Sequence, residues 1–127
     1  MALTNAGAIA LASLAVADGA YPAFNTANSY LAIGTDSTAF SAAQTALLAQ
    51  NGARKAMVDA SYPSRSNGAL TFRSLWGTAD GIGAWLEWGT FNASTSGTML
   101  NRKSENLGTK GGTQSWQLTV TLTLAAA

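Results

Sequence analysis

Residues 116–124 alternate strictly between apolar and polar side chains, and no other segment constrains the fold as much. The apolar positions are Trp116, Leu118, Val120, Leu122 and Leu124, and the polar positions between them are Gln117, Thr119, Thr121 and Thr123. Successive side chains of a β-strand point to opposite faces, so this period of two predicts a strand with one buried face. The chain therefore has to build a sheet whose inner face is covered by a second apolar layer.

The second half of the chain contains further segments that resemble strands. They are residues 53–62, 69–76, 82–91 and 98–103. Pro63 and the polar residues 64–68 end the first, and a polar tip at residues 92–97 joins the last two into a hairpin. The glycine-containing residues 104–113 are expected to form either a flexible loop or an arm that reaches a neighbouring subunit. Short strands separated by turn residues predict an antiparallel β-sandwich or jelly-roll-like sheets.

The N-terminal segment predicts a helix. Thr4 or Asn5 can cap it, it runs to about Ala17, and Asp18-Gly19 ends it. The apolar run within it covers residues 6–17. A signal peptide would require Lys or Arg before such a run, and none is present there. A bilayer span takes about 20 residues. We therefore expect a buried or partner-facing helix, and no membrane partner.

A short strand and a second helix are predicted before residue 52. Residues 29–35 are apolar on both sides, which favours a strand buried on both faces. Ser41 and Gln44 form a capping-box pattern, and Asn51-Gly52 is a typical helix stop. These residues predict a short helix over residues 42–50.

The predicted fold class is therefore mainly β, with antiparallel sheets, an N-terminal helix and one further short helix. We expect a single domain over residues 1–127. Residues 1–20 form its helical N-terminal segment, and residues 52–127 form its main β region.

The charge content of the chain bears on its partners. Only 10% of the residues are charged and the formal net charge is +1, whereas an average globular protein has about 25% charged residues. Charge keeps folded proteins apart, so a weakly charged chain favours self-association or docking on a larger assembly. Arg54-Lys55 and Arg102-Lys103 are isolated basic pairs rather than a clustered basic footprint, so nucleic acid is not expected as a partner.

The sequence contains no cysteine and no histidine. Disulfides, zinc sites made of Cys and His, cysteine nucleophiles and histidine-dependent triads are thereby excluded. Among the six carboxylates, Asp18, Asp36 and Asp80 sit in turn contexts, where Asp bonds the local backbone. No calcium-loop or phosphate-loop motif is present. We expect no catalytic residue, no metal and no cofactor.

Glu87 is the unusual carboxylate, because it lies between Trp85 and Trp88 in an otherwise apolar segment. A buried carboxylate has to be paired or neutralised. Its possible partners are Arg102, Lys103, Arg54 and Arg73. We expect a Glu–Arg pair that fixes the strand register; a salt link across a subunit boundary and a ligand-binding or catalytic role are the alternatives.

Aromatic residues surround Glu87 in the sequence. By simple alternation Glu87 shares a face with Trp85 and Phe91, whereas Trp88 points to the opposite face. One of the two tryptophans should therefore be core, and the other is a candidate interface residue. Sugars stack on exposed indole faces, so Trp85 or Trp88 could alternatively serve a carbohydrate-binding module.

The residues above also carry a family likeness. The matching segments are Leu3-Thr4-Asn5-Ala6-Gly7, Leu31-Ala32-Ile33-Gly34, Gln44-Thr45 with Leu47, Arg54-Lys55-Ala56-Met57, Leu70-Thr71-Phe72-Arg73, Glu87-Trp88-Gly89 with Phe91-Asn92, Gly97-Thr98-Met99-Leu100-Asn101-Arg102-Lys103, Leu107-Gly108-Thr109-Lys110 and Trp116-Gln117-Leu118-Thr119-Val120. Through them the chain resembles small structural proteins of tailed bacteriophages. It is more distantly similar to the N-terminal domain of phage tail-collar fibre proteins.

This resemblance implies a non-enzymatic virion component. Our first hypothesis is a capsid decoration or cement protein that binds the major capsid protein and itself as a homo-oligomer, expected to be a trimer. A tail or collar component, such as a fibre adaptor, is the alternative, and a carbohydrate-binding module is a second one. The expected location is the virion, and the candidate interface or register residues are Trp85, Glu87, Trp88, Phe91 and Arg102.

Overall fold

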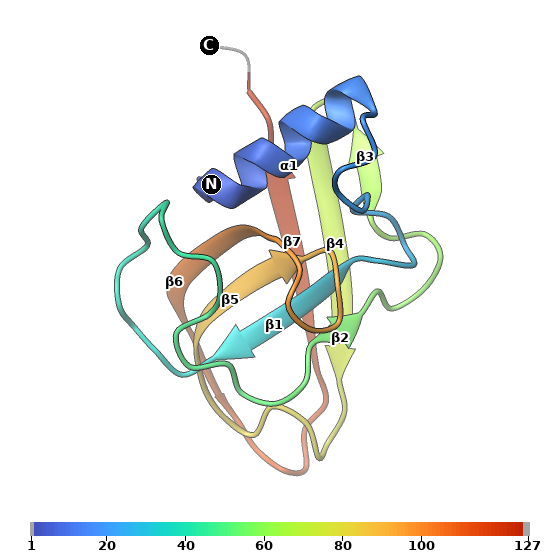
Figure 1. Ribbon diagram of the computed structural model, residues 1–127. Coiled ribbons are helices and arrows are strands. Elements are labelled where there is room, and N and C mark those ends of the chain that lie inside the picture. Colours follow the sequence, from blue (N-terminus) through green and yellow to red (C-terminus); the bar gives the residue numbers. More distant parts are fainter. Residues whose placement is uncertain (1, 126–127) are drawn as a thin grey trace.

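The structure is a computed structural model, and it describes residues 2–125. One helix, α1 (Asn5–Val16), lies in this part of the chain and is followed by seven strands (Figure 1). The strands are β1 (Tyr30–Gly34), β2 (Lys55–Ala56), β3 (Ser64–Ser66), β4 (Ala69–Trp76), β5 (Gly83–Phe91), β6 (Met99–Lys110) and β7 (Trp116–Thr123). The expected mainly β fold with an N-terminal helix is confirmed.

The strands form two antiparallel sheets. The first has the order β2-β1-β5-β6, and the second has the order β3-β4-β7. Every described pairing is antiparallel. The sheets face each other, with β4 and β7 of the second sheet crossing behind β1 (Figure 1). This arrangement is the sandwich that the strand pattern predicts.

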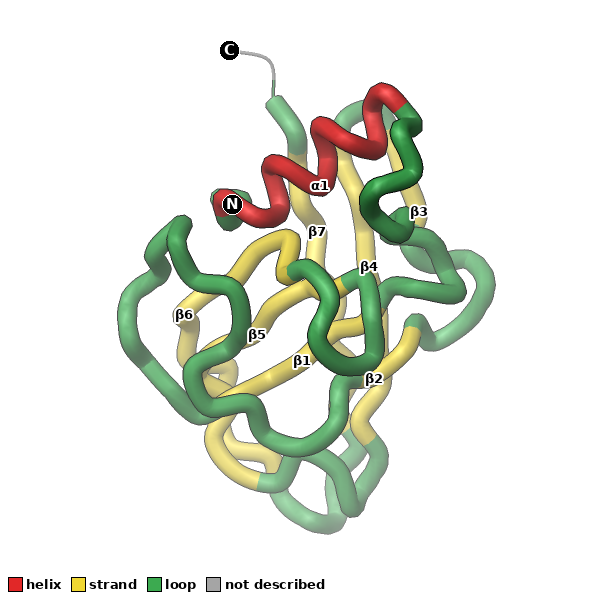
Figure 2. Tube along the Cα trace, viewed as in Figure 1, coloured by secondary structure: helices red, strands yellow, loops and turns green. Residues whose placement is uncertain are grey.

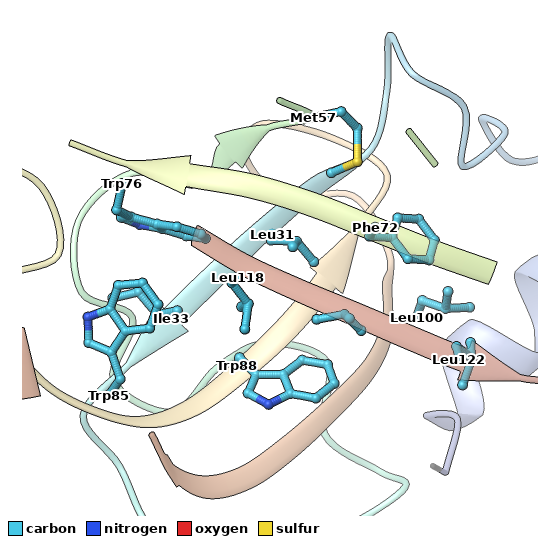
Figure 3. Close-up of a cluster of buried hydrophobic side chains, with 11 residues drawn as sticks. Leu31, Ile33, Met57, Phe72, Trp76, Trp85, Trp88, Leu100, Leu118 and Leu122 are labelled. Carbon is cyan, nitrogen blue, oxygen red and sulfur yellow. The ribbon is translucent and has the colours of Figure 1, made fainter. Parts of the chain in front are cut away.

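The main hydrophobic core fills the space between the two sheets (Figure 3). Its buried residues are Leu31, Ile33, Met57, Phe72, Trp76, Trp85, Trp88, Leu100, Leu118, Val120 and Leu122. Strand β7 shows the predicted alternation, with Leu118, Val120 and Leu122 buried and the threonines between them exposed. Burying each large apolar side chain contributes about 1.5–3 kcal/mol, so this layer is the main source of stability.

A second layer covers the outer face of the β1–β5–β6 sheet. Residues 35–54, the connection from β1 to β2, form a long loop over this face (Figure 2). Leu47 of this loop packs in a small buried cluster with Ala32, Phe91 and Met99 of the sheet. Strand β1 is therefore buried on both faces, as its two-sided apolar pattern predicts.

Helix α1 is attached to the start of β6. Thr4 caps the helix, accepting a hydrogen bond from the backbone N–H of Gly7 at 2.8 Å, and its own N–H donates to the carbonyl of Leu100 at 3.0 Å. Gly7 allows close packing, because a Cβ there would lie 2.2 Å from the Leu100 carbonyl oxygen. The helix ends at Val16, followed by Ala17 in the left-handed conformation. Within residues 2–125, no helix is long and apolar enough to cross a membrane.

Four expectations about individual elements are wrong. The helix expected over residues 42–50 is absent, and turns and irregular backbone take its place. The strand expected over residues 53–62 is reduced to the two residues of β2. The polar residues Ser64–Ser66, expected only to end that strand, form β3. Residues 104–110, expected as a loop or an arm, continue β6, because they pair with the first half of β5.

Candidate functional site

Glu87 and Arg102 form a fully buried ion pair on the outer face of the β5–β6 ribbon. The Arg102 Nε donates to Glu87 Oε1 at 2.8 Å, and neither side chain is exposed to solvent. Gly89 of β5 lies opposite Arg102 of β6, so Glu87 and Arg102 are diagonal neighbours on one face of the sheet. Of the four basic residues that the sequence offers as partners, Arg102 is the one that pairs with Glu87.

The Glu87 carboxylate also binds the covering loop. Its Oε1 accepts from the backbone N–H of Leu48 at 2.9 Å, and its Oε2 accepts from that of Ala49 at 2.8 Å. The N–H of Asp36, at the other end of the same loop, donates to Oε2 at 3.3 Å. Together with Arg102 these donors satisfy both carboxylate oxygens, which is the condition for burying a carboxylate. Glu87 therefore fastens both arms of the loop to the sheet.

This binding explains why the second helix is absent. The capping-box contact does form, since Gln44 Oε1 accepts from the Ser41 N–H at 3.1 Å. A helix would then require the N–H groups of Leu48 and Ala49 to bond to carbonyls four residues earlier. They bond to the Glu87 carboxylate instead, and hydrogen bonds to a charged group contribute about 1.5–3 kcal/mol, more than neutral ones. The local signal is real, but a carboxylate distant in the sequence takes the donors.

Arg102 fastens the middle of the loop. Its Nη1 donates to the carbonyl of Thr38 at 2.9 Å and to Gln44 Oε1 at 3.3 Å. Its Nη2 lies 3.9 Å from the Asp36 carboxylate. Hydrogen bonding by Thr38 lowers the pKa of the Asp36 carboxyl below its ordinary value, and the charge of Arg102 lowers it further. The guanidinium therefore joins β6 and Glu87 to Asp36, Thr38 and Gln44 of the loop.

Gly34 is part of this site, although the sequence analysis did not single it out. It lies opposite Glu87 in the β1–β5 pairing. A Cβ at Gly34 would lie 2.5 Å from Glu87 Oε2 and 2.5 Å from the carbonyl oxygen of Ala49. The position must therefore lack a side chain for the carboxylate to reach the loop. A glycine inside an apolar strand is the sequence feature that could have indicated such a close approach.

Trp85 and Trp88 both lie in the core between the sheets, with exposed fractions of 1% and 4%. Figure 3 shows both indoles among the buried side chains of this core cluster. The expectation that they point to opposite faces is wrong, because a register shift between Trp85 and Glu87 interrupts the alternation. Neither indole offers a face to a partner or a sugar in this chain.

The hydrogen bonds and ring contacts of these indoles are internal. The Trp85 Nε1 donates to the Gly81 carbonyl at 2.7 Å, and the Trp88 Nε1 donates to Glu105 Oε2 at 3.2 Å. The Trp85 ring makes edge contacts with Trp76 at 5.0 Å and with Trp116 at 5.1 Å between ring centroids. Such aromatic pairs contribute about 0.5–1.5 kcal/mol beyond burial. Trp85 and Trp88 thus act as core residues.

Phe91 lies on the Glu87 face of β5, in the cluster under the loop. The Arg54 guanidinium carbon is 3.5 Å from the centroid of its ring. The Arg54 Nη1 also donates to the carbonyls of Ala93 and Ser96, at 2.9 and 2.8 Å, and so holds the tip of the β5–β6 hairpin. Burial lowers the pKa of Arg54 from its ordinary value. The five predicted site residues thus separate into two core tryptophans and a group, Glu87, Arg102 and Phe91, beneath the loop.

Glu87 and Arg102 hold the loop of residues 35–54 on the sheet. Their carboxylate and guanidinium are buried and engaged with the backbone. No group of three or more Asp or Glu residues in the described part of the chain could hold a metal ion. No protein-family model matches the chain, and no curated protein matches it. The function of the chain is therefore inferred from its own residues.

Proposed function

We propose that this chain is a non-enzymatic structural protein of a tailed bacteriophage virion, and specifically a capsid decoration protein that binds and stabilises the shell. One observation carries the proposal: the segments that resemble phage structural proteins converge on a single buried assembly. Gly34, Gln44, Glu87 and Arg102 from four such segments meet around the ion pair. The cluster beneath the loop comes from the same segments: its members are Ala32, Leu47, Phe91 and Met99.

The likeness is thus carried by residues that maintain the fold. Two ionisable residues of the likeness, Glu87 and Arg102, are fully buried and hydrogen-bonded within the chain. This pattern supports a structural role.

In the proposed mechanism, many copies of the chain bind to the assembled shell, and each copy adds to its stability. Copies of the chain would bury apolar surface and pair strand edges with capsid subunits, and ligands that bind only the assembled state stabilise it by mass action. A charge content of 10% favours such packing, because closely placed copies repel one another little. The partners in this proposal are the major capsid protein and other copies of this chain, in the virion.

Copy number tests the proposal. Purified virions would be analysed by quantitative mass spectrometry, with the major capsid protein as the internal standard. A decoration protein should approach the copy number of the capsid protein, whereas a collar or fibre adaptor should be present in a small, ring-like number. A small number would replace decoration with the tail or collar alternative, and absence from the particle would overturn a virion role.

A further inference from the structure

The two sheets have four edge strands, β2 and β6 in the first sheet and β3 and β7 in the second. Two of them are short. Strand β2 has two residues and strand β3 has three, including the exposed Arg65. Short, charged edges are typical of strands that do not pair with other chains.

The edge of β6 is longer but protected. At its start, Leu3 bridges to Asn101, and the Thr4 N–H donates to the carbonyl of Leu100. Further along, it carries Lys103 and Glu105, which form an ion pair at 3.4 Å. A covered start and charged side chains both disfavour pairing with another strand.

The edge of β7 has none of these protections. Its eight residues, Trp116–Thr123, include no charged residue and no proline, and they pair with β4 without a register shift. Within residues 2–125, no backbone hydrogen bond joins these eight residues to a segment other than β4. The backbone groups on the far side of β7 are thus a regular template for one more strand.

We propose that β7 pairs antiparallel with β7 of a second copy of this chain, around a two-fold axis at Val120. This inference specifies the self-association that the proposed function includes, as a two-fold dimer in place of the trimer that the resemblance leads us to expect. The pairing would join two three-stranded sheets into one sheet with the order β3-β4-β7-β7-β4-β3. A second copy is the occupant because an uncharged strand is complementary to itself: a two-fold contact places no like charges opposite each other. On the outer face, Thr119 would lie opposite Thr121 of the second copy.

The inner face supplies a second argument. Leu124 follows β7 and is 44% exposed, although it continues the apolar side of the strand. With Val120 on the axis, Leu124 would lie opposite Trp116 of the second copy. Trp116 borders a cavity of about 370 Å³ that is also lined by Trp85, Leu107 and Leu118. The pairing would therefore cover an exposed leucine and a partly open aromatic cavity together, twice in each dimer.

The first test is the mass of the purified full chain in solution, measured by light scattering and sedimentation over a wide concentration range. We expect a dimer of the 13.0 kDa chain that dissociates on dilution. Thr121→Lys places a charge on the exposed face of β7 and should give a folded monomer. Ser66→Lys, on the opposite edge of the same sheet, is the matched control and should remain dimeric. A monomeric or trimeric wild type, or a dimeric Thr121→Lys, would overturn the proposal.

Charge complementation makes the test specific. In the proposed register the two Thr121 positions are diagonal neighbours, about 7–8 Å apart. Thr121→Lys and Thr121→Asp should each be monomeric, and their equimolar mixture should recover the dimer. Two folded variants that stay monomeric when mixed would contradict the pairing. Because these measurements use the isolated chain, they can fail while the virion copy number still supports decoration, and the reverse also holds.

Discussion

The Arg102 guanidinium donates to the Glu87 carboxylate at 2.8 Å in a position where neither side chain reaches solvent. The pair joins adjacent strands, and both of its members also bind the loop of residues 35–54. Desolvating two charges offsets much of their attraction, so the value of such a pair becomes apparent when one partner is removed. Glu87 and Arg102 thus determine whether the loop stays on the sheet.

The first prediction concerns Glu87→Gln, which keeps the shape of the side chain and removes its charge. Arg102 would then be a buried cation without its buried counter-ion, and the side-chain amide would face N–H donors. We expect the free energy of unfolding to fall by about 3–5 kcal/mol, as measured by urea denaturation. Glu105→Gln is the control, because that carboxylate is part-exposed and pairs with Lys103, and its loss should change stability by less than about 1 kcal/mol. Equal stability of Glu87→Gln and wild type would show that the pair is not structurally important.

Residues 42–50, compared with strands β4 and β7, show which parts of the fold can be predicted from the sequence. Strands β4 and β7 are predictable because their neighbours agree with the local period of two. The helix over residues 42–50 is not, because the N–H groups of Leu48 and Ala49 bind a carboxylate 39 and 38 residues away. Local propensity cannot anticipate a competitor that only the tertiary fold brings near.

The tryptophans give the second example. Counting by two along β5 assumes a regular strand, and the irregularity between Trp85 and Glu87 moves both indoles to one face. A buried pair between Glu87 and a basic residue was predictable, since a carboxylate among apolar residues requires a cation. Which of the four basic candidates supplies it was not, and the structure shows Arg102. The hydrogen bonds from Glu87 to the loop could not be predicted, because every residue except proline has a backbone N–H and the sequence does not show which of them lie near the carboxylate.

The second prediction concerns Arg102→Lys. Lysine keeps the charge but lacks the planar fork that reaches the Thr38 carbonyl and Gln44 together with Glu87. Losing hydrogen bonds to a charged group costs about 1.5–3 kcal/mol each. We therefore expect the loop to open more often, with amide hydrogen exchange at Leu48 faster by at least about tenfold.

Lys103→Arg is the control for this experiment, because Lys103 is half-exposed on the neighbouring position of β6. It should leave the exchange rate at Leu48 unchanged. Arg102→Lys with wild-type exchange at Leu48 would mean that the loop is held without the guanidinium.

The third prediction is a loss of stability in acid. Hydrogen bonding from Lys55, at 3.0 Å, and its charge lower the pKa of Asp80 below its ordinary value. A carboxyl with a lowered folded-state pKa contributes stability that is fully present above the unfolded-state pKa of about 3.9. That stability is lost as the pH falls through the lower, folded-state pKa. The free energy of unfolding should therefore decline as the pH falls below about 5.

Asp80→Asn should make that decline shallower, and Lys55→Met should have the same effect from the other side of the pair. Both can be followed by urea denaturation at a series of acidic pH values. A decline as steep as that of wild type in both variants would show that the Lys55–Asp80 pair does not contribute to the acid sensitivity.

The fourth prediction concerns Gly34→Ala. The added Cβ would lie 2.5 Å from Glu87 Oε2 and from the Ala49 carbonyl oxygen, closer than real Cβ contacts, so either the carboxylate or the loop has to move. Overpacking of this kind costs about 1–3 kcal/mol, and we expect a loss of that size in thermal and urea unfolding. Gly77→Ala is the matched control, because its nearest neighbour would be 3.6 Å away and its backbone requires no positive φ. If the two alanine variants were equally stable, the close approach of β1 to Glu87 would not constrain the fold. If amide hydrogen exchange at Leu48 became faster in Gly34→Ala and not in Gly77→Ala, then Gly34 would be required for the Glu87 carboxylate to hold the loop.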